Sequence, residues 1–242
     1  MKLLIIRHGE PNYEKNSLTE KGFREAEYLA ERLSKLDIKE FYVSPLGRAK
    51  DTASPTLERM GRQAKECEWL REFDARIIRP DRGYESISWD WLPQEWTAEK
   101  KYYDRDAWGS TDIMQAGKVK EEYDRVTGSF DELLASHGYR READYYKVER
   151  GNTDTIALFC HFGVECVMLS HLLGVSPMVL WHGICALPTS VTTVITEERR
   201  KGTAYFRING FGDLSHLYAA GEEPSFSARF CEVYENMEER HD

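Results

Sequence analysis

Two histidines, His8 and His161, each stand directly after a short apolar run of the chain. His8 follows residues 3–6 and belongs to the motif Arg-His-Gly-Glu, and His161 follows residues 155–160 and precedes Phe-Gly. Both runs are typical of strands that are buried on both faces of a sheet. Because ligands of an open parallel sheet bind beyond the carboxyl ends of its strands, we expect both imidazoles at one edge.

Two arginines are expected beside these histidines. Arg7 precedes His8, and Arg48 opens a predicted helix after a short strand at 41–43. Phosphoryl transfer requires stabilisation of charge on three equatorial oxygens, and the guanidinium fork matches phosphate oxygens bidentately. A neutral imidazole is a competent nucleophile if its other ring N–H donates to a carbonyl or carboxylate. The set therefore predicts phosphoryl transfer through a phosphohistidine on His8.

A metal centre is the alternative chemistry for two histidines at one edge of a sheet. Neither motif brings carboxylate or thiolate ligands at a usual spacing, and the flanking arginines repel a cation. We therefore expect no metal ion at the site.

The segments between the motifs alternate between helix and strand patterns. Ser17-Leu18-Thr19-Glu20 fits a capping box, with Thr19 as an alternative N-cap, and apolar residues follow at helical spacing to about Lys35. Further helices are expected at 48–60, 163–173 and 226–240, and further strands at 190–196 and 204–208. This alternation predicts an α/β fold, a three-layer sandwich with a mainly parallel sheet flanked by helices.

The regular pattern is interrupted between about residues 73 and 151 by a charged, aromatic stretch. We expect a single domain over 1–242 in which 74–150 form an inserted helical and aromatic cap. Four of the six tryptophans fall in this stretch, and we favour a core of the cap's own over an aromatic wall that stacks on a substrate. Three arginines either face solvent, as we favour for at least two, or bind a second anionic group: Arg76, Arg79 and Arg82.

The charge balance bears on the kind of partner. The 242 residues carry a formal net charge of -9, which disfavours a general nucleic-acid binder because phosphate backbones demand a basic surface. A small phosphate ester is compatible, since a few local arginines outweigh a remote acidic surface. No apolar run approaches the length of a membrane span. We therefore expect a small-molecule phosphate ester as partner, with neither nucleic acid nor membrane, and leave a homodimer open.

Cysteine usage and the N-terminal run indicate the compartment. The five cysteines are dispersed, odd in number and contain no C-x-x-C pair, which favours reduced thiols over a disulfide framework or a zinc site. The apolar run at the start is too short for the core of a signal peptide. We therefore expect a cytoplasmic protein.

The motifs, in their order and spacing, resemble those of the histidine phosphatase superfamily, the phosphoglycerate mutase-like family. They are I-R-H-G-E at 6–10, S-L-T-E-K-G-F-R-E-A at 17–26, Y-V-S-P-L-G-R-A-K-D-T-A at 42–53 and C-H-F-G at 160–163. The resemblance implies a mainly parallel sheet flanked by helices and no metal or organic cofactor. It also implies that His8 is the nucleophile, that Arg7, Arg48 and His161 bind phosphate, and that an acidic residue donates a proton.

The second histidine motif departs from the family pattern. A serine usually precedes this histidine and a glycine follows it, whereas Cys160 and Phe162 stand here. The backbone N–H of Phe162 still suits phosphate binding, and its ring would reshape the pocket. Family members also carry an asparagine soon after the first motif, for which Asn12 is our candidate and Asn16 the alternative.

The general acid must protonate the leaving oxygen and then take a proton from water, so a carboxyl with a raised pKa is wanted. Glu72 stands where the resemblance implies the acid, and Glu10, beside the nucleophile, is the alternative. Glu165 is expected on the helix after His161, where it faces solvent or a core arginine.

The predicted function is metal-independent hydrolysis of a phosphomonoester of a small phosphorylated metabolite, as in histidine acid-type phosphatases. The first alternative is a cofactor-dependent phosphoglycerate mutase, which we disfavour because the basic and glycine-containing stretches of family mutases are not found in the insertion. The second is a weakly catalytic phosphate-binding module, against which the presence of His8, Arg7, Arg48 and His161 argues.

Overall fold

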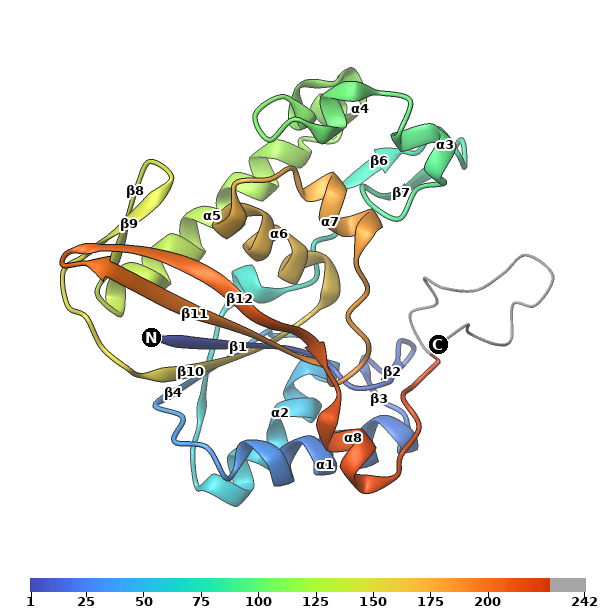
Figure 1. The fold of residues 1–242 in the computed structure, drawn as a ribbon. Coiled ribbons are helices and arrows are strands. Elements are labelled where there is room, and N and C mark those ends of the chain that lie inside the picture. Colours follow the sequence, from blue (N-terminus) through green and yellow to red (C-terminus); the bar gives the residue numbers. More distant parts are fainter. Residues whose placement is uncertain (227–242) are drawn as a thin grey trace.

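The computed structural model describes residues 1–226 of the 242. An eight-stranded sheet forms its middle layer, in the order β5-β4-β10-β1-β11-β12-β9-β8 (Figure 1). The bounds of these strands, in that order, are Ala64–Glu66, Glu40–Val43, Thr155–Cys160, Lys2–Arg7, Val191–Arg200, Thr203–Asp213, Tyr145–Val148 and Tyr139–Glu142. The strands from β5 to β1 are parallel neighbours, and the remaining pairs are antiparallel. The predicted helix at 226–240 lies, apart from its first residue, outside the described residues.

Helices cover both faces of the sheet, which confirms the predicted three-layer α/β fold (Figure 1). The helices below the sheet in this view are α1, Glu20–Leu33; α2, Gly47–Met60; and α8, Ser215–Ala220. Those above it are α5, Val119–Ser136; α6, Phe162–Leu173; and α7, Pro177–Gly183. Side chains of β1 alternate between two hydrophobic clusters, one on each face of the sheet. Leu4 and Ile6 pack with residues of α1 and α2, and Leu3 and Ile5 pack on the face covered by α5, α6 and α7.

Half of the sheet is antiparallel, because β11 and β12 are joined by a short turn. The turn contains Gly202, whose φ of +87° lies in the region that favours glycine. So short a link permits only antiparallel pairing, since a parallel neighbour requires a crossover of a dozen or more residues. The strands that deliver the two histidine motifs, β1 and β10, belong to the parallel half.

The segment predicted as an insertion divides into two parts. Its first part holds a two-stranded sheet and several short helices at the top of Figure 1, and its last part, β8 and β9, extends the main sheet beyond β12. The elements of the first part are β6, Arg76–Ile78; β7, Glu85–Ile87; α3, Pro93–Trp96; two 3₁₀ helices, Lys100–Tyr103 and Trp108–Ser110; and α4, Asp112–Ala116. The pairing of β9 with β12 was not predicted, because it joins segments far apart in the sequence.

Aromatic residues of this segment are buried in a core that they share with the main body, rather than in the separate core that was favoured. Trp89, Trp91 and Trp108 are buried, and the Trp108 ring lies 5.2 Å from Tyr123 of α5 and 5.9 Å from Trp181 of α7 between centroids. Edge-on packing of this kind is the preferred geometry for aromatic pairs. The insertion is therefore held to the main body by buried rings rather than by its charged surface.

Two of the three arginines expected to face solvent do so. Arg76 and Arg82 are exposed, whereas Arg79 is buried, forms an ion pair with Asp81 and donates to the carbonyl of Trp89 at 3.0 Å. A guanidinium already satisfied in this way is not available to a second anionic group of a substrate.

The N-cap of the first helix is Thr19 rather than Ser17. The Thr19 hydroxyl accepts a hydrogen bond from the N–H of Gly22 at 3.0 Å, while the Ser17 hydroxyl donates to Asp51. Replacing Thr19 with alanine should lower the free energy of unfolding by about 1 kcal/mol, because the Gly22 amide loses its acceptor. Urea unfolding measures the change, and Thr19→Ser should retain most of the stability. Equal losses for both variants would contradict the capping role.

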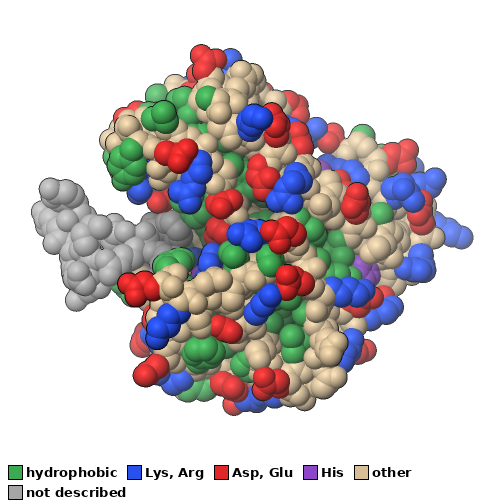
Figure 2. Space-filling view, turned by 180° about the vertical axis from the view of Figure 1, so that it is seen from behind, with side chains coloured by type: hydrophobic (Ala, Val, Ile, Leu, Met, Phe, Trp, Pro, Cys, Tyr) green, Lys and Arg blue, Asp and Glu red, His purple; other side chains and the backbone are tan. Residues whose placement is uncertain are grey.

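The surface carries charges of both signs. Figure 2 shows acidic and basic side chains interspersed over one face of the molecule. Over residues 1–226, no helix combines the length and the apolar content needed to cross a membrane.

Candidate active site

The parallel pairing of β1 and β10 brings the two histidines together. Arg7 and Cys160, the last residues of these strands, are opposite one another, and the N–H of His8 donates to the Cys160 carbonyl at 3.0 Å. The rings of His8 and His161 lie 5.0 Å apart between centroids, at an angle of 58°. The site therefore forms beyond the carboxyl ends of these strands, where ligands of α/β sheets bind.

His8 has one ring nitrogen engaged and the other available. Its Nδ1–H donates to the carbonyl of Gly9 at 2.7 Å, so Nε2 carries the lone pair when the ring is neutral. Burial lowers the pKa of His8 well below its ordinary value, and the charges of Arg7 and Arg48 lower it further. The imidazole is therefore neutral at physiological pH, which is the form that can attack phosphorus.

His161 is held by a residue of a third strand end. Ser44, directly after β4, forms a 2.8 Å hydrogen bond with Nε2 of His161. The other ring nitrogen, Nδ1, is buried and has no hydrogen-bond partner among residues 1–226. Burial lowers the pKa of His161 well below its ordinary value, as do His8 and the nearby arginines. Ser44 was not among the predicted site residues, although its place in the S-P-L-G-R motif directly after a strand indicated a position at the same edge of the sheet.

Arg7 and Arg48 carry no ion pair with a carboxylate in the described part of the chain. Arg7 is buried, donates to the carbonyl of Ala186, and has its Cζ 5.7 Å from the centroid of the Phe162 ring. The Nε atoms of both arginines are buried and have no hydrogen-bond partner among the residues that the structure describes. Buried polar groups are normally paired, so these donors have the capacity to bind an anion.

The structure places Asn16, rather than Asn12, against Arg48. Asn16 Oδ1 accepts a hydrogen bond from Nη1 of Arg48 at 3.3 Å, whereas Asn12 Oδ1 accepts from the backbone N–H of Lys15 at 3.2 Å within the turn. The turn joins two short strands, β2 at Pro11–Asn12 and β3 at Ser17–Leu18. The contact of Asn16 with Arg48 depends on how this turn folds over α2, which the local sequence does not show.

Glu72 lies close to both arginines. Its Oε1 accepts hydrogen bonds from the N–H of Phe73 at 2.9 Å and the N–H of Val164 at 3.3 Å. Burial raises the pKa of the Glu72 carboxyl, although part of the side chain is accessible to solvent; Arg7, these bonds and Arg48 act in the opposite direction. A carboxyl with a raised pKa beside two arginines has the property that a general acid requires.

Glu10, the alternative acid, is tied to other groups. Its carboxylate accepts hydrogen bonds from the hydroxyls of Thr19 and Ser225, the first at 2.7 Å, and its N–H donates to the carboxyl of Glu25 at 3.0 Å. The two hydroxyl bonds hold the Glu10 carboxylate toward the start of α1.

The Glu72 carboxyl lies so close to the backbone of residue 163 that only glycine fits there. A Cβ atom at this residue would lie 2.6 Å from Oε1 of Glu72 and 3.0 Å from two ring atoms of Trp89. Both distances are far shorter than ordinary van der Waals contact.

Replacing Gly163 with alanine should therefore displace the Glu72 carboxyl and lower kcat by about 10²-fold, the size expected for a misplacement near 1 Å. Steady-state kinetics measures the loss. Gly128→Ala on α5 is the matched control, because a Cβ there meets no atom within 4 Å. It should leave kcat unchanged and increase stability by about 0.5–1 kcal/mol. Similar kinetics for both variants would contradict the placement of Glu72.

The structure decides between the two environments expected for Glu165, solvent or a core arginine. Rather than facing solvent, it is buried in the first turn of α6, where Arg7 and Glu72 are its charged neighbours. The other expected environment, a core arginine, is the one that the structure shows.

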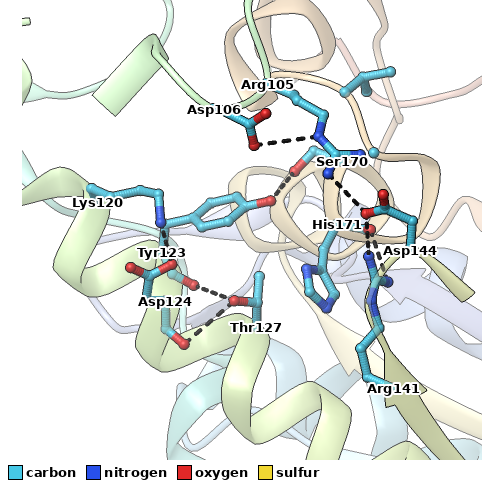
Figure 3. Close-up of a pocket in the computed structure, with 12 residues that line it drawn as sticks. Arg105, Asp106, Lys120, Tyr123, Asp124, Thr127, Arg141, Asp144, Ser170 and His171 are labelled. Carbon is cyan, nitrogen blue, oxygen red and sulfur yellow. Dashed lines mark hydrogen bonds and ion pairs between the residues drawn. The ribbon is translucent and has the colours of Figure 1, made fainter. Parts of the chain in front are cut away.

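A cavity of about 280 Å³ lies at the other end of α6 (Figure 3). Three basic residues line it, and each forms an ion pair: Arg105 and Arg141 with Asp144, and Lys120 with Asp124. Since α6 has 12 residues and is about 18 Å long, this cavity is remote from His161. The basic side chains of this cavity are paired with carboxylates, whereas Arg7 and Arg48 form no ion pair with a carboxylate of residues 1–226. Among residues 1–226, no three side chains of His, Cys, Asp or Glu form a group that could hold a metal ion.

The fold and the site together define a class of α/β proteins in which two neutral histidines and two arginines meet at the strand ends. The family model that matches this chain is the histidine phosphatase superfamily, branch 1, over residues 3–208. The chain therefore belongs to this superfamily, which confirms the resemblance.

Characterised proteins similar to the chain include phosphatases and a mutase. It is 26% identical to phosphoserine phosphatase 1 of Hydrogenobacter thermophilus, over 83% of this chain and 89% of that one. A 2,3-bisphosphoglycerate-dependent phosphoglycerate mutase of Thermoplasma acidophilum is 47% identical over 60 residues, which are 21% of this chain and only 30% of the relative's length. A phosphoserine phosphatase from Entamoeba histolytica, solved with phosphoserine, has the same fold, with a TM-score of 0.55 and 21% identity over 89% of this chain and 98% of that one.

Proposed function

We propose that this protein hydrolyses phosphomonoesters of small metabolites, without a metal ion, through a phosphohistidine on His8. The observation that carries the proposal is the neutral His8 ring, with Nδ1 bonded to a carbonyl and Nε2 available. Beside it lie two arginines that form no ion pair with a carboxylate of residues 1–226. The weakly catalytic binding module is disfavoured, because such a protein has no need of an activated nucleophile.

In the first step, Nε2 of His8 forms a bond to phosphorus while the ester oxygen leaves and takes a proton from the Glu72 carboxyl. Arg7, Arg48 and Nδ1 of His161 stabilise the charge on the equatorial oxygens. In the second step, the Glu72 carboxylate takes a proton from water as the water oxygen attacks phosphorus. Phosphate leaves, and His8 and Glu72 return to their starting forms.

Phosphoglycerate mutase is the second candidate, because a mutase is among the relatives. A mutase requires the phosphoenzyme to resist water long enough for transfer to a second hydroxyl. The two candidates therefore differ in the fate of the phosphohistidine rather than in how it forms.

The deciding experiment is a set of turnover assays with EDTA present. The substrates are an aryl phosphate, phosphoserine, 3-phosphoglycerate and a small panel of other metabolite esters, with 2,3-bisphosphoglycerate added as mutase cofactor in parallel. Phosphate release with an acid-labile phosphoenzyme supports the phosphatase. Interconversion of phosphoglycerates without phosphate release supports the mutase. A folded protein with neither activity would contradict both and leave the binding module.

We also propose a cytoplasmic location, supported by the free thiols of Cys67, Cys160 and Cys166, which suit a reducing compartment. A homodimer is the proposed alternative to a monomer. Light scattering on the same preparation measures the oligomeric state.

A further inference from the structure

Glu165 is a buried carboxyl whose oxygens complete no hydrogen bond of ordinary geometry within the described part of the chain. Its side chain is 1% exposed, and neither Oε1 nor Oε2 completes a hydrogen bond within residues 1–226. The hydroxyl of Thr192 faces it and favours its charged form without completing a bond of ordinary geometry. Burying an ionised carboxylate is costly unless the charge is paired. The group is therefore neutral unless a cation compensates its charge.

The cation available to Glu165 is Arg7. Phe162 lies three residues before Glu165, on the same side of α6, and the Cζ of Arg7 is 5.7 Å from the Phe162 ring centroid. Arg7 also has a buried Nε atom for which residues 1–226 provide no acceptor. A guanidinium donor and a carboxyl acceptor are thus both unsatisfied in one buried region, which is unusual in a folded protein.

The polar and titratable neighbours of Glu165 come from four elements and from the segment that carries Glu72. Burial raises the pKa of the Glu165 carboxyl to about 7; Thr192 on β11 and Arg7 on β1 lower it, and Glu72 raises it. The thiols of Cys160 on β10 and Cys166 on α6 are uncharged, because burial raises the pKa of each well above its ordinary value. Among these neighbours, Arg7 is therefore the one positive charge with which the Glu165 carboxylate can pair.

We propose that Glu165 is a positioning residue whose carboxylate competes with the phosphoryl group for Arg7. The neutral acid leaves Arg7 to the phosphoryl oxygens, whereas the carboxylate pairs with Arg7 and withdraws it from them. This inference rests on the proposed function, because it takes Arg7 as a phosphate-binding residue. Anion binding then requires a proton on Glu165, so affinity is full below a pH of about 7 and falls about tenfold per pH unit above it.

The test is calorimetric measurement of sulfate binding between about pH 6 and pH 8.5. Sulfate is the probe because it keeps both negative charges over this range, so that its own titration does not contribute. The wild-type dissociation constant should rise about tenfold per unit above pH 7. Glu165→Gln, which mimics the neutral acid, should bind sulfate with a dissociation constant that does not follow this rise. Glu165→Met gives a second variant without a titrating group, and circular dichroism establishes that each variant is folded.

Glu25→Gln is the matched control. Burial also raises the pKa of the Glu25 carboxyl to about 7, but its strongest interactions are with Glu10, Lys21 and Glu222. This variant should keep the wild-type pH dependence. A wild-type slope in both Glu165 variants, or no sulfate binding by the wild type at about pH 6, would overturn the proposal. Sulfate binding needs no turnover, so loss of the proposed hydrolase function would be seen separately, in the ester assays.

Turnover provides a second readout. If Glu165 acts through Arg7 on anion binding, the wild-type KM should rise above pH 7 while kcat changes less, and Glu165→Gln should remove the rise in KM. A purely structural role for Glu165 would lower the stability of the variants without changing the pH dependence of KM.

Discussion

Replacement of His8 by alanine is expected to lower kcat by at least about 10³-fold and to abolish the phosphoenzyme. His8 is the imidazole whose Nε2 is available, because its Nδ1–H is bonded to the Gly9 carbonyl. The other ring of the site, His161, has its Nε2 engaged by Ser44. The measurements are steady-state phosphate release and trapping of labelled phosphoenzyme after rapid quenching at alkaline pH.

The matched control for His8→Ala is His171→Gln. His171 lies near the other end of α6 and forms a 2.8 Å contact with Asp131, remote from the strand ends. Its replacement should leave kcat and the phosphoenzyme unchanged. Equal activity of His8→Ala and the wild type would refute the phosphohistidine mechanism, whatever the substrate.

Replacement of Glu72 by glutamine is expected to lower kcat by about 10²–10⁴-fold for alkyl phosphates, the range for loss of general acid–base catalysis. An aryl phosphate should lose less in the first step, since its leaving oxygen needs no proton. Burial raises the pKa of Glu72, so the wild-type carboxyl keeps its proton to a higher pH than an ordinary glutamate. The activity of the wild type should fall as pH rises through this pKa, because the carboxyl then loses the proton that it donates. The residual activity of Glu72→Gln should not show this fall.

Glu10→Gln is the comparison that decides between the two candidate acids. Glu10 accepts hydrogen bonds from Thr19 and Ser225, which leaves it a structural role at the start of α1. We expect its replacement to change kcat much less than Glu72→Gln does. A larger loss in Glu10→Gln, with the leaving-group dependence described above, would transfer the acid role to Glu10.

Local patterns predicted the elements that carry the site. The apolar runs of β1 and β10 and the helical spacing of α1 are short-range signals, since each depends on a few neighbouring residues. The residue types at the strand ends predicted His8 as the nucleophile, and the resemblance of the motifs added the expected acid, Glu72. The α/β class followed from the alternation of these elements, because a strand–helix–strand unit favours parallel pairing.

Tertiary structure decided which groups meet. The contacts of Ser44 with His161 and of Asn16 with Arg48 join segments that no local period relates. The addition of β8 and β9 to the sheet likewise depends on long-range pairing, as does the burial of Arg79. Sequence patterns report which face of an element is apolar, but not which distant element covers it.

Glu165 shows the same division most clearly. The sequence by itself determined that this carboxyl stands in the first turn of a helix after His161, where a solvent-facing acid is common. Only the packing of α6 against the end of β1 decided that the carboxyl is buried near Arg7 and Glu72. The physical reason is that helix formation depends on neighbouring residues, whereas desolvation and charge pairing depend on every element that folds around the group.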